Sequence, residues 1–376
     1  MSGDEASMDA RYMAATLALA RRALGRVWPN PAVGALIVQP GAHGPVVVGR
    51  GVTQPPGGPH AEVVALRQAG ARAQGATCYV TLEPCSHQGR TGPCAVALAE
   101  AGIARVVIGL LDPNPRVAGR GVEILRARGV EVVTGVAGAD CARHHAGHVY
   151  RLREGRPHVV LKLAVSRDGY IGREGAGQIP ITGEDVFRRV HLLRAECDGI
   201  LVGVGTAIAD DPILNCRLPG MANRSPVRVV MDTNARLPLA SRLVTTAREV
   251  PVWVVVSSAA DADRIADLTA AGCTVIRLAT PKDGRLDPRA ALRALGQRGL
   301  TRLMVEGGAG IARAMVDADL ADTVIVSRGD MEVGAGGIRP LVDRGVEVFE
   351  DPARFVRTGS WQVGRDAMTS YRRKEA

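Results

Sequence analysis

The sequence of 376 residues contains few aromatic side chains and almost no lysine. Phe, Trp and Tyr make up 3% of the chain, and only three of the 47 basic residues are lysines. The net charge of +9 is spread along the chain, with 14 basic and 10 acidic residues in 1–150 and 33 and 28 in 151–376. Scattered charge, with few aromatic rings to stack on bases, disfavours a nucleic-acid partner. We therefore expect a small phosphorylated substrate.

Long apolar runs and a signal sequence are also absent. The richest apolar stretch, 199–209, is about half of the ~20 residues that span a bilayer. Acidic residues stand near the N-terminus, where a secretory signal peptide would carry a basic and then an apolar segment. Seven cysteines, an odd number, do not suggest a disulfide framework. We expect a cytoplasmic protein with no membrane-bound part.

The length and the order of the predicted elements favour two α/β domains, 1–150 and 151–376. At ~100–200 residues per domain, the chain is long enough for two. Short β-branched runs alternate with helical patterns in both halves, which predicts layered sheets covered by helices. A basic, histidine-containing stretch at 143–157 interrupts this alternation and marks the boundary. Strands are expected at 32–38, 46–52, 76–82, 105–110 and 130–134, and then at 159–165, 199–204, 227–231, 252–256, 274–278, 302–305 and 323–326.

The strongest chemical signal is a set of metal-binding side chains in the first half. His60 and Glu62 open a predicted helix, and Cys85 and Cys94 follow later in the chain. One imidazole and two thiolates supply three zinc ligands and leave the fourth tetrahedral position open for water. Zinc lowers the pKa of such a water towards ~7, and Glu62 is placed to carry the proton to a leaving nitrogen. The pattern predicts a zinc-dependent deaminase with His60, Cys85 and Cys94 as ligands and Glu62 as the catalytic acid–base.

The spacing of the two cysteines is specific. Zinc nucleobase deaminases combine His-x-Glu with Pro-Cys-x-x-Cys, whereas eight residues separate Cys85 from Cys94 here. With this spacing, the first half resembles the deaminase half of the bifunctional riboflavin-biosynthesis deaminase–reductases. The motifs that carry the resemblance are Pro29-Asn30-Pro31-Ala32-Val33-Gly34, His60-Ala61-Glu62, the run from Thr81 to Cys94, and the run from Asp112 to Gly119.

This resemblance implies a cytidine-deaminase-like, three-layer α/β/α domain. The implied reaction is hydrolytic removal of the 2-amino group from a diaminopyrimidinone that carries a ribosylamino 5′-phosphate. The implied substrate contacts come from Asn30, His87 and Arg90, with Asp112 and Asn114 on the ribose side.

In the second half, a glycine-rich turn at 307–310 connects a predicted strand to a helix. Main-chain amides and a helix N-terminus in such a turn can bind phosphate. No Gly-x-Gly-x-x-Gly follows the first strand of this half, so a standard Rossmann domain is not supported. Together with 161–169, 181–183, 192–195 and 203–214, the turn resembles the reductase half of the same enzymes, whose α/β fold is similar to that of dihydrofolate reductase.

The second resemblance implies NADPH-dependent reduction of the ribosyl group to ribityl. The implied cofactor-binding residues are Ala164, Thr206, Asp210, Gly307, Gly308, Ala309 and Gly310, and the implied substrate-binding residues are Arg194, Leu214, Arg217 and Glu306. We add Lys162 to the substrate site, because a lysine in a chain that otherwise uses arginine suggests a specific role. Pro180 stands where relatives commonly carry an aromatic residue beside the nicotinamide, which leaves the preference between NADPH and NADH open.

Two other functions are compatible with a zinc site. A tRNA or nucleoside deaminase would predict the Pro-Cys-x-x-Cys spacing and a basic surface. A nucleic-acid-binding protein with a structural zinc would need a fourth protein ligand and a localised positive patch. The sequence shows neither set of features. Because deaminase folds of this kind often complete their sites across subunits, we expect a homo-oligomer.

Overall fold

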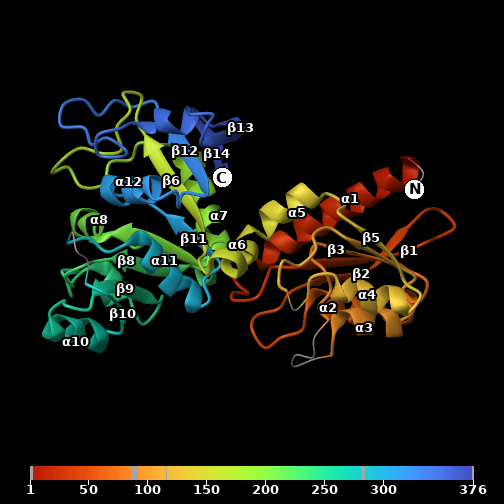
Figure 1. The fold of residues 1–376 in the computed structure, drawn as a ribbon. Coiled ribbons are helices and arrows are strands. Elements are labelled where there is room, and N and C mark those ends of the chain that lie inside the picture. Colours follow the sequence, from red (N-terminus) through yellow and green to blue (C-terminus); the bar gives the residue numbers. More distant parts are fainter. Residues whose placement is uncertain (1–2, 87–91, 116, 281–283, 375–376) are drawn as a thin grey trace. The chain divides into compact units, whose positions relative to one another are not determined.

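The computed structural model describes residues 3–86, 92–115, 117–280 and 284–374. The chain divides into two compact units, Met1–Gly155 and Arg156–Ala376 (Figure 1). Residue 150, where the sequence suggests a boundary, lies inside helix α6 (Ala146–Glu154). Within the described residues, no helix combines the length and the apolar character that a membrane span requires.

The first unit is built around a five-stranded sheet with the order β2-β1-β3-β4-β5. β1 pairs with β2 and β3 in antiparallel fashion, and β3, β4 and β5 are parallel. The strands are β1 (Gly34–Gln39), β2 (Val46–Val52), β3 (Thr77–Val80), β4 (Arg105–Ile108) and β5 (Glu131–Thr134). The helices are α1 (Gly3–Ala20), α2 (Ala61–Ala69), α3 (Cys94–Glu100), α4 (Arg120–Ala127), α5 (Gly138–His144) and α6, with short 3-10 turns at Arg21–Ala23 and Gly70–Ala73.

Helices cover both faces of this sheet. Met13 of α1 and Cys141 of α5 share a buried cluster with Leu36 of β1. On the opposite face, Ala65 of α2 and Leu98 of α3 pack with α4 against the alternate strand residues. The alternation of buried side chains along each strand therefore produces the expected three-layer α/β/α arrangement.

The second unit is built around a nine-stranded sheet with the order β10-β9-β8-β7-β11-β6-β12-β14-β13. The strands from β10 to β12 are parallel, and β14 and β13 form an antiparallel hairpin at one edge. The strands are β6 (His158–Val165), β7 (Gly199–Gly203), β8 (Val227–Met231), β9 (Val252–Ser257), β10 (Thr274–Leu278), β11 (Arg302–Val305), β12 (Thr323–Arg328), β13 (Phe355–Val363) and β14 (Asp366–Arg373). The helices are α7 (Glu184–Glu196), α8 (Val204–Asp210), α9 (Arg242–Thr245), α10 (Ala262–Ala270), α11 (Pro288–Gln297) and α12 (Ala309–Asp317), with 3-10 turns at Ala222–Arg224 and Val346–Glu350.

The two faces of this second sheet have separate cores. α8, α9 and α10 contribute Ala207, Leu243 and Leu268 to a cluster with alternate residues of β7, β8 and β9. α7 packs on the other side, where Val190 joins Met304 of β11. The parallel strands need helical crossovers between them, so both faces are covered.

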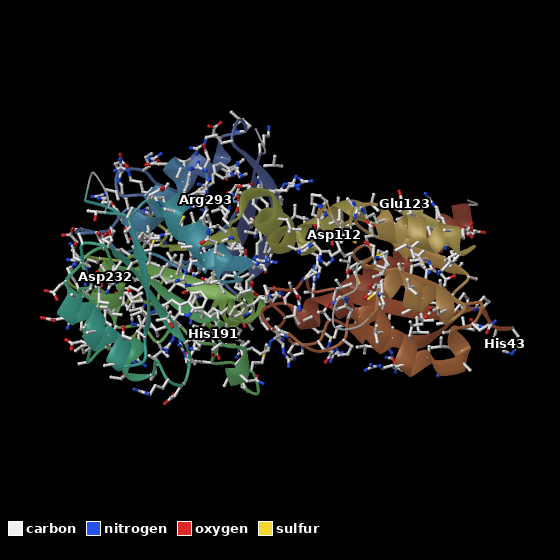
Figure 2. All side chains as sticks on the ribbon, turned by 60° about the horizontal axis from the view of Figure 1, so that its bottom comes forward. His43, Asp112, Glu123, His191, Asp232 and Arg293 are labelled. Atoms are coloured by element: carbon white, nitrogen blue, oxygen red, sulfur yellow. The ribbon has the colours of Figure 1, made fainter. Side chains whose placement is uncertain are left out.

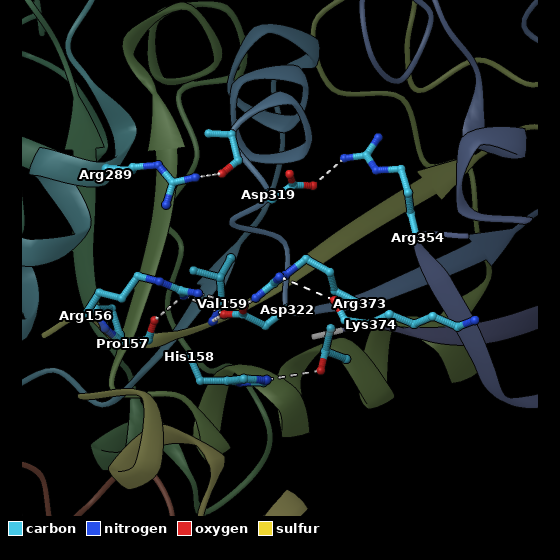
Figure 3. A network of polar contacts seen from close by, with 12 residues as sticks. Arg156, Pro157, His158, Val159, Arg289, Asp319, Asp322, Arg354, Arg373 and Lys374 are labelled. Atoms are coloured by element: carbon cyan, nitrogen blue, oxygen red, sulfur yellow. Dashed lines mark hydrogen bonds and ion pairs between the residues drawn. The ribbon is translucent and has the colours of Figure 1, made fainter. Parts of the chain in front are cut away.

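A buried ionic network joins the starts of β6 and β12 in the second unit (Figure 3). The Asp322 carboxylate accepts two hydrogen bonds from the Arg156 guanidinium, at 2.6 and 2.8 Å, and one from the Val159 amide at 2.9 Å. Arg373 of β14 donates to the same carboxylate at 3.2 Å. One aspartate thus connects the central strand β6 with the edge hairpin, at the end of the sheet away from the carboxyl ends of the parallel strands.

Candidate active sites

The predicted zinc ligands of the first unit come together at the ends of two helices. His60 caps the N-terminus of α2, Cys94 is the first residue of α3, and Cys85 lies in the loop after β3. The Nδ1 atom of His60 is 3.6 Å from Cys85 Sγ and 3.3 Å from Cys94 Sγ. All three donor atoms lie within 4.8 Å of one another.

Two glycines of β2 position this end of α2. A Cβ on Gly51 would lie 1.9 Å from the Ala61 carbonyl oxygen, and one on Gly49 would lie 2.3 Å from that of Ala65. Only glycine allows the helix main chain to approach the strand this closely. The helix therefore starts where His60 and Glu62 can face the two cysteines.

The three donor atoms fit a zinc ion. Ligands 2.0–2.3 Å from a tetrahedral zinc lie about 3.5 Å apart, close to the separations of His60 Nδ1 from the two sulfurs. The Cys94 amide also donates to Cys85 Sγ at 3.3 Å, which favours a thiolate there. Hydrogen bonding from Cys94 and His60 lowers the pKa of Cys85 despite its burial. A set of one imidazole and two thiols with these separations is suited to zinc.

Glu62 lies in the first turn of α2 and is 3% exposed. Burial raises the pKa of its carboxyl group to about 7, and the nearby Cys85 adds to the shift. The side chain is therefore held in a buried position next to the three ligand residues. This is the placement that the sequence predicts for a catalytic carboxylate.

Glu83, next to the proposed ligands in the chain, has a structural role that the sequence does not predict. Its buried carboxylate accepts hydrogen bonds from four main-chain amides, those of 112, 119, 121 and 122, at 2.9 to 3.4 Å. Because these amides include the start of α4, the negative charge is stabilised by the helix N-terminus. Glu83 therefore joins the Cys85 loop to the segment that begins at Asp112. Its place within the motif before Cys85 is the only signal that the sequence offers.

The remaining predicted contacts of the first site have mixed outcomes. Asn30 is half-buried in the turn before β1, and its main-chain N–H donates to the Val27 carbonyl oxygen at 2.9 Å. Asp112, labelled in Figure 2, accepts from the Asn114 amide at 2.9 Å and contacts His148 Nε2 at 3.2 Å. His87 and Arg90 lie outside the described residues.

The second unit contains a buried charge cluster at its central strands. Arg194 of α7 donates to both oxygens of Glu306, at 2.8 and 2.6 Å, and also to the Asn215 carbonyl oxygen at 3.0 Å. Glu306 directly follows β11, whose last residue pairs with Leu161 of β6. Lys162 is the next residue of β6, and burial lowers the pKa of its ammonium group while Glu306 opposes that shift. The structure therefore brings Lys162, Arg194 and Glu306 together, as the sequence analysis expects of a substrate site.

Arg217 and Leu214 differ in their exposure. Arg217 is exposed, and its guanidinium lies 5.3 Å from the centre of the Phe187 ring. In the described part of the chain it forms no ion pair with a carboxylate, whereas Arg194 is fully engaged with Glu306. Leu214 packs in the hydrophobic core at 4% exposure. Arg217 is therefore better placed than Arg194 to bind a phosphate.

The predicted cofactor residues lie at the carboxyl ends of neighbouring strands. The sheet order places β7, β11 and β6 side by side, and α8, the 307–310 turn and Ala164 stand at or near their ends. Gly307 and Gly308 have φ values of +104° and +74°, and a Cβ on Gly308 would lie 2.6 Å from Thr206 Oγ1. Thr206 and Asp210 are four residues apart in α8 and share a helix face. This turn, with the N-terminus of α12 behind it, fits the phosphates of a dinucleotide.

Comparison with known families assigns both units. Residues 6–110 match the model of the cytidine and deoxycytidylate deaminase zinc-binding region, and residues 157–369 match that of the RibD C-terminal domain. The chain belongs to the RibD family. RibD proteins similar to it include that of Escherichia coli, 37% identical over 95% of this chain and 97% of that protein, and that of Haemophilus influenzae, 38% identical over 85% of each.

Solved structures of the RibD family agree with the fold. RibD of Acinetobacter baumannii aligns with a TM-score of 0.83 at 34% identity, covering 98% of this chain and 100% of that one. A Thermotoga maritima protein described as a diaminohydroxyphosphoribosylaminopyrimidine deaminase/5-amino-6-(5-phosphoribosylamino)uracil reductase aligns with a TM-score of 0.84 at 31% identity, with the same coverage. The chain is thus an enzyme with a cytidine-deaminase-like domain followed by a RibD reductase domain. The zinc-ligand cluster lies in the first matched range and the Lys162 cluster in the second.

Proposed function

We propose that this RibD protein catalyses two consecutive steps of riboflavin biosynthesis on one phosphorylated pyrimidine. The first unit hydrolyses the 2-amino group of a diaminopyrimidinone that carries a ribosylamino 5′-phosphate, and the second reduces the ribosyl group to ribityl with NADPH. The observation that carries the proposal is the convergence of His60, Cys85 and Cys94 beside the buried Glu62. The family match over both units supports the pairing of the two reactions.

In the deamination, His60, Cys85 and Cys94 hold the zinc ion. When bound, the ion would act as a Lewis acid that makes water nucleophilic at neutral pH. Glu62 accepts a proton from the water that attacks C2 of the pyrimidine and delivers it to the departing 2-amino nitrogen, so that ammonia leaves. Glu83, two residues before Cys85, binds the main-chain amides of 112, 119, 121 and 122 and so helps to fix Cys85 relative to the start of α4.

For the reduction, bound NADPH would supply the hydride that reaches C1′ of the ribose. That step requires the bond between C1′ and the ring oxygen to break and the ring oxygen to take up a proton. The Lys162 side chain forms no hydrogen bond to the part of the chain that the structure describes, and burial lowers the pKa of its ammonium group, so it is suited to donate this proton. Glu306 holds Arg194 and balances the charge of Lys162.

The substrate and cofactor occupy different parts of the second unit. Arg217 binds the 5′-phosphate, because its guanidinium is exposed and offers paired donors. The proposed cofactor contacts are Ala164, Thr206, Asp210, Gly307, Gly308, Ala309 and Gly310, which lie at the ends of β6 and β11 and in helix α8 after β7.

We further propose that the enzyme acts in the cytoplasm as a homo-oligomer and has no nucleic-acid partner. All seven cysteines are free thiols, which suits a reducing compartment. Sedimentation of the purified chain tests the oligomer, and the absence of salt-sensitive retention on duplex DNA tests the last point.

The defining experiment supplies the diaminopyrimidinone substrate with zinc and NADPH, and measures ammonia and NADPH together. Equal amounts of ammonia released and NADPH consumed are expected, with ammonia appearing first. Lys162→Met abolishes NADPH consumption and leaves ammonia release intact, whereas Lys374→Met, at an exposed position, changes neither. NADPH consumption without ammonia release, or ammonia release that depends on Lys162, contradicts the proposal.

A further inference from the structure

One face of helix α7 fixes the main chain of the segment 215–217. His191 and Arg194 lie three residues apart on α7, so they share a face of that helix. His191 Nδ1 accepts the Arg217 amide at 3.0 Å, and Arg194 donates to the Asn215 carbonyl oxygen at 3.0 Å. Between them, the Cys216 thiol contacts the His191 carbonyl oxygen at 3.5 Å. Three consecutive residues are thus tied to one helical turn.

The Arg217 side chain is held from the same turn. Its guanidinium donates to Asn215 Oδ1 at 3.2 Å and lies over the Phe187 ring at 5.3 Å. The Phe187 ring in turn packs on the His191 ring, with a centroid distance of 4.2 Å. His191 therefore supports both the main chain of Arg217 and the aromatic surface on which its guanidinium rests.

The protonation state of His191 follows from these contacts. Because Nδ1 accepts a main-chain N–H, the proton of the neutral ring is on Nε2. Burial, with the positive charges of Arg194 and Arg217, lowers the pKa of His191 to about 4, against the opposing charge of Glu306. The side chain is fully buried (0% exposed), and Nε2 has no hydrogen-bond partner among the described residues. His191, labelled in Figure 2, is thus an internal group that acts through Arg217 rather than by touching substrate.

We infer that His191 is a positioning residue that gives the reductase its preference for a phosphorylated substrate, by fixing Arg217 where it binds the phosphate. This inference rests on the proposed function, which assigns Arg217 to the substrate phosphate. The alternative, that His191 merely fills the core, predicts the same losses for phosphorylated and dephosphorylated substrates.

The test measures NADPH oxidation by the full chain on the deaminated substrate with and without its 5′-phosphate. His191→Leu leaves the Arg217 amide without an acceptor and raises KM for the phosphorylated substrate about tenfold. We expect kcat and the KM for NADPH to stay within about twofold, and the KM for the dephosphorylated substrate to be unchanged. His191→Asn restores an acceptor near the Nδ1 position and brings KM back towards that of the parent enzyme.

Further variants distinguish the role of His191 from misfolding and from a general disruption of α7. Phe187 is 44% exposed, so Phe187→Leu leaves the fold intact while removing the ring beneath Arg217, and raises the same KM by a smaller factor. Leu192, 41% exposed on the same helix, provides the control, because Leu192→Ala changes none of these constants. In an Arg217→Ala background, His191→Leu adds no further loss for the phosphorylated substrate.

The possible failures are distinguishable. If the unmodified enzyme oxidises no NADPH, or if Arg217→Ala leaves KM unchanged, the proposed function is wrong and this inference falls with it. If Arg217→Ala raises KM but His191→Leu does not, or affects both substrates equally, only the role of His191 is overturned.

Discussion

We predict that Glu306→Gln destabilises the second unit. Among the described residues, Glu306 supplies the one carboxylate that pairs with Arg194 and lies near Lys162. The Arg194 and Glu306 side chains are 10% and 11% exposed, so water screens their charges poorly. Burial alone would raise the pKa of Glu306, but Arg194 and Lys162 lower it from 4.5 to about 2. At 1.36 kcal/mol per pKa unit, that shift corresponds to about 3 kcal/mol of stability, in line with the ~3–5 kcal/mol lost when one partner of a buried ion pair is removed.

The sign of this contribution also predicts a pH dependence. A lowered folded-state pKa means that the Glu306 contribution is fully present above pH 4.5 and is lost as the pH falls towards 2. The Glu306→Gln variant therefore shows a smaller loss of stability across that range than the parent protein. Urea unfolding at neutral pH and at pH 3 measures both effects.

The assay needs a signal from the second unit alone, because two units do not unfold as one transition. Trp253 and Trp361 lie in the second unit and Trp28 in the first, so Trp28→Phe provides a background whose fluorescence reports the second unit. Glu332→Gln is the matched control. Glu332 pairs with Arg167 at 2.8 Å but is 59% exposed, so its loss costs less than about 1 kcal/mol. Equal destabilisation by the two glutamine variants would refute the reasoning.

Three other predictions follow from single residues. Gly308→Ala places a side chain on a residue with a φ of +74°, and we expect it to raise KM for NADPH about tenfold without affecting ammonia release. Gly205→Ala is the control, because nothing lies within 4 Å of a Cβ at that position, and it should change KM little. Steady-state kinetics measure both KM values. Burial lowers the pKa of His158 to about 4, so as the pH falls the unfolded chain binds a proton at this residue before the folded chain does. The free energy of unfolding of the second unit therefore decreases by up to about 3 kcal/mol between pH 6.5 and pH 4. His158→Gln flattens that slope in pH-dependent unfolding, and an unchanged slope contradicts the assignment. We expect the Cys94→Ser variant to contain no zinc when its metal content is measured and to release no ammonia, but still to oxidise NADPH. Cys273, buried in the other unit, provides the control, because Cys273→Ser should keep the zinc and both reactions.

Much of the fold could be predicted because the strands have a clear sequence signal. The expected strands of both sheets form within a few residues of their predicted ends, since buried parallel strands are runs of β-branched residues. The hairpin of β13 and β14 is not predicted from the sequence. Only the first and last residues of β13 are buried, so this exposed strand shows no continuous apolar run.

The stretch at 143–157, where the sequence suggests the boundary between domains, contains the division between the two compact units after Gly155. It forms the end of α5 and all of α6. His145 is fully enclosed and contacts Thr81 Oγ1 at 3.0 Å. The sequence pattern indicates the boundary but not the helix that ends there, because contacts such as that of His145 with Thr81 join residues distant in the chain.

The candidate sites were predictable where one residue type determines the chemistry. His60, Cys85 and Cys94 form the expected cluster. This cluster could be predicted because residues that bind one metal ion have to lie close together in the fold. Glu83 and His191 were not predicted, because each acts through main-chain amides that are distant in sequence. Such partners leave no pattern in a single sequence.

The central claim, that the two units perform separate consecutive reactions, is tested most directly by Glu62→Gln in the full chain. Glu123→Gln, an exposed position on α4 of the same unit, is the control. We predict that Glu62→Gln releases no ammonia from the diaminopyrimidinone but reduces the deaminated substrate with NADPH at the parent rate, and that Glu123→Gln does both. Ammonia release that survives Glu62→Gln, or loss of both reactions in a folded variant, would contradict the account.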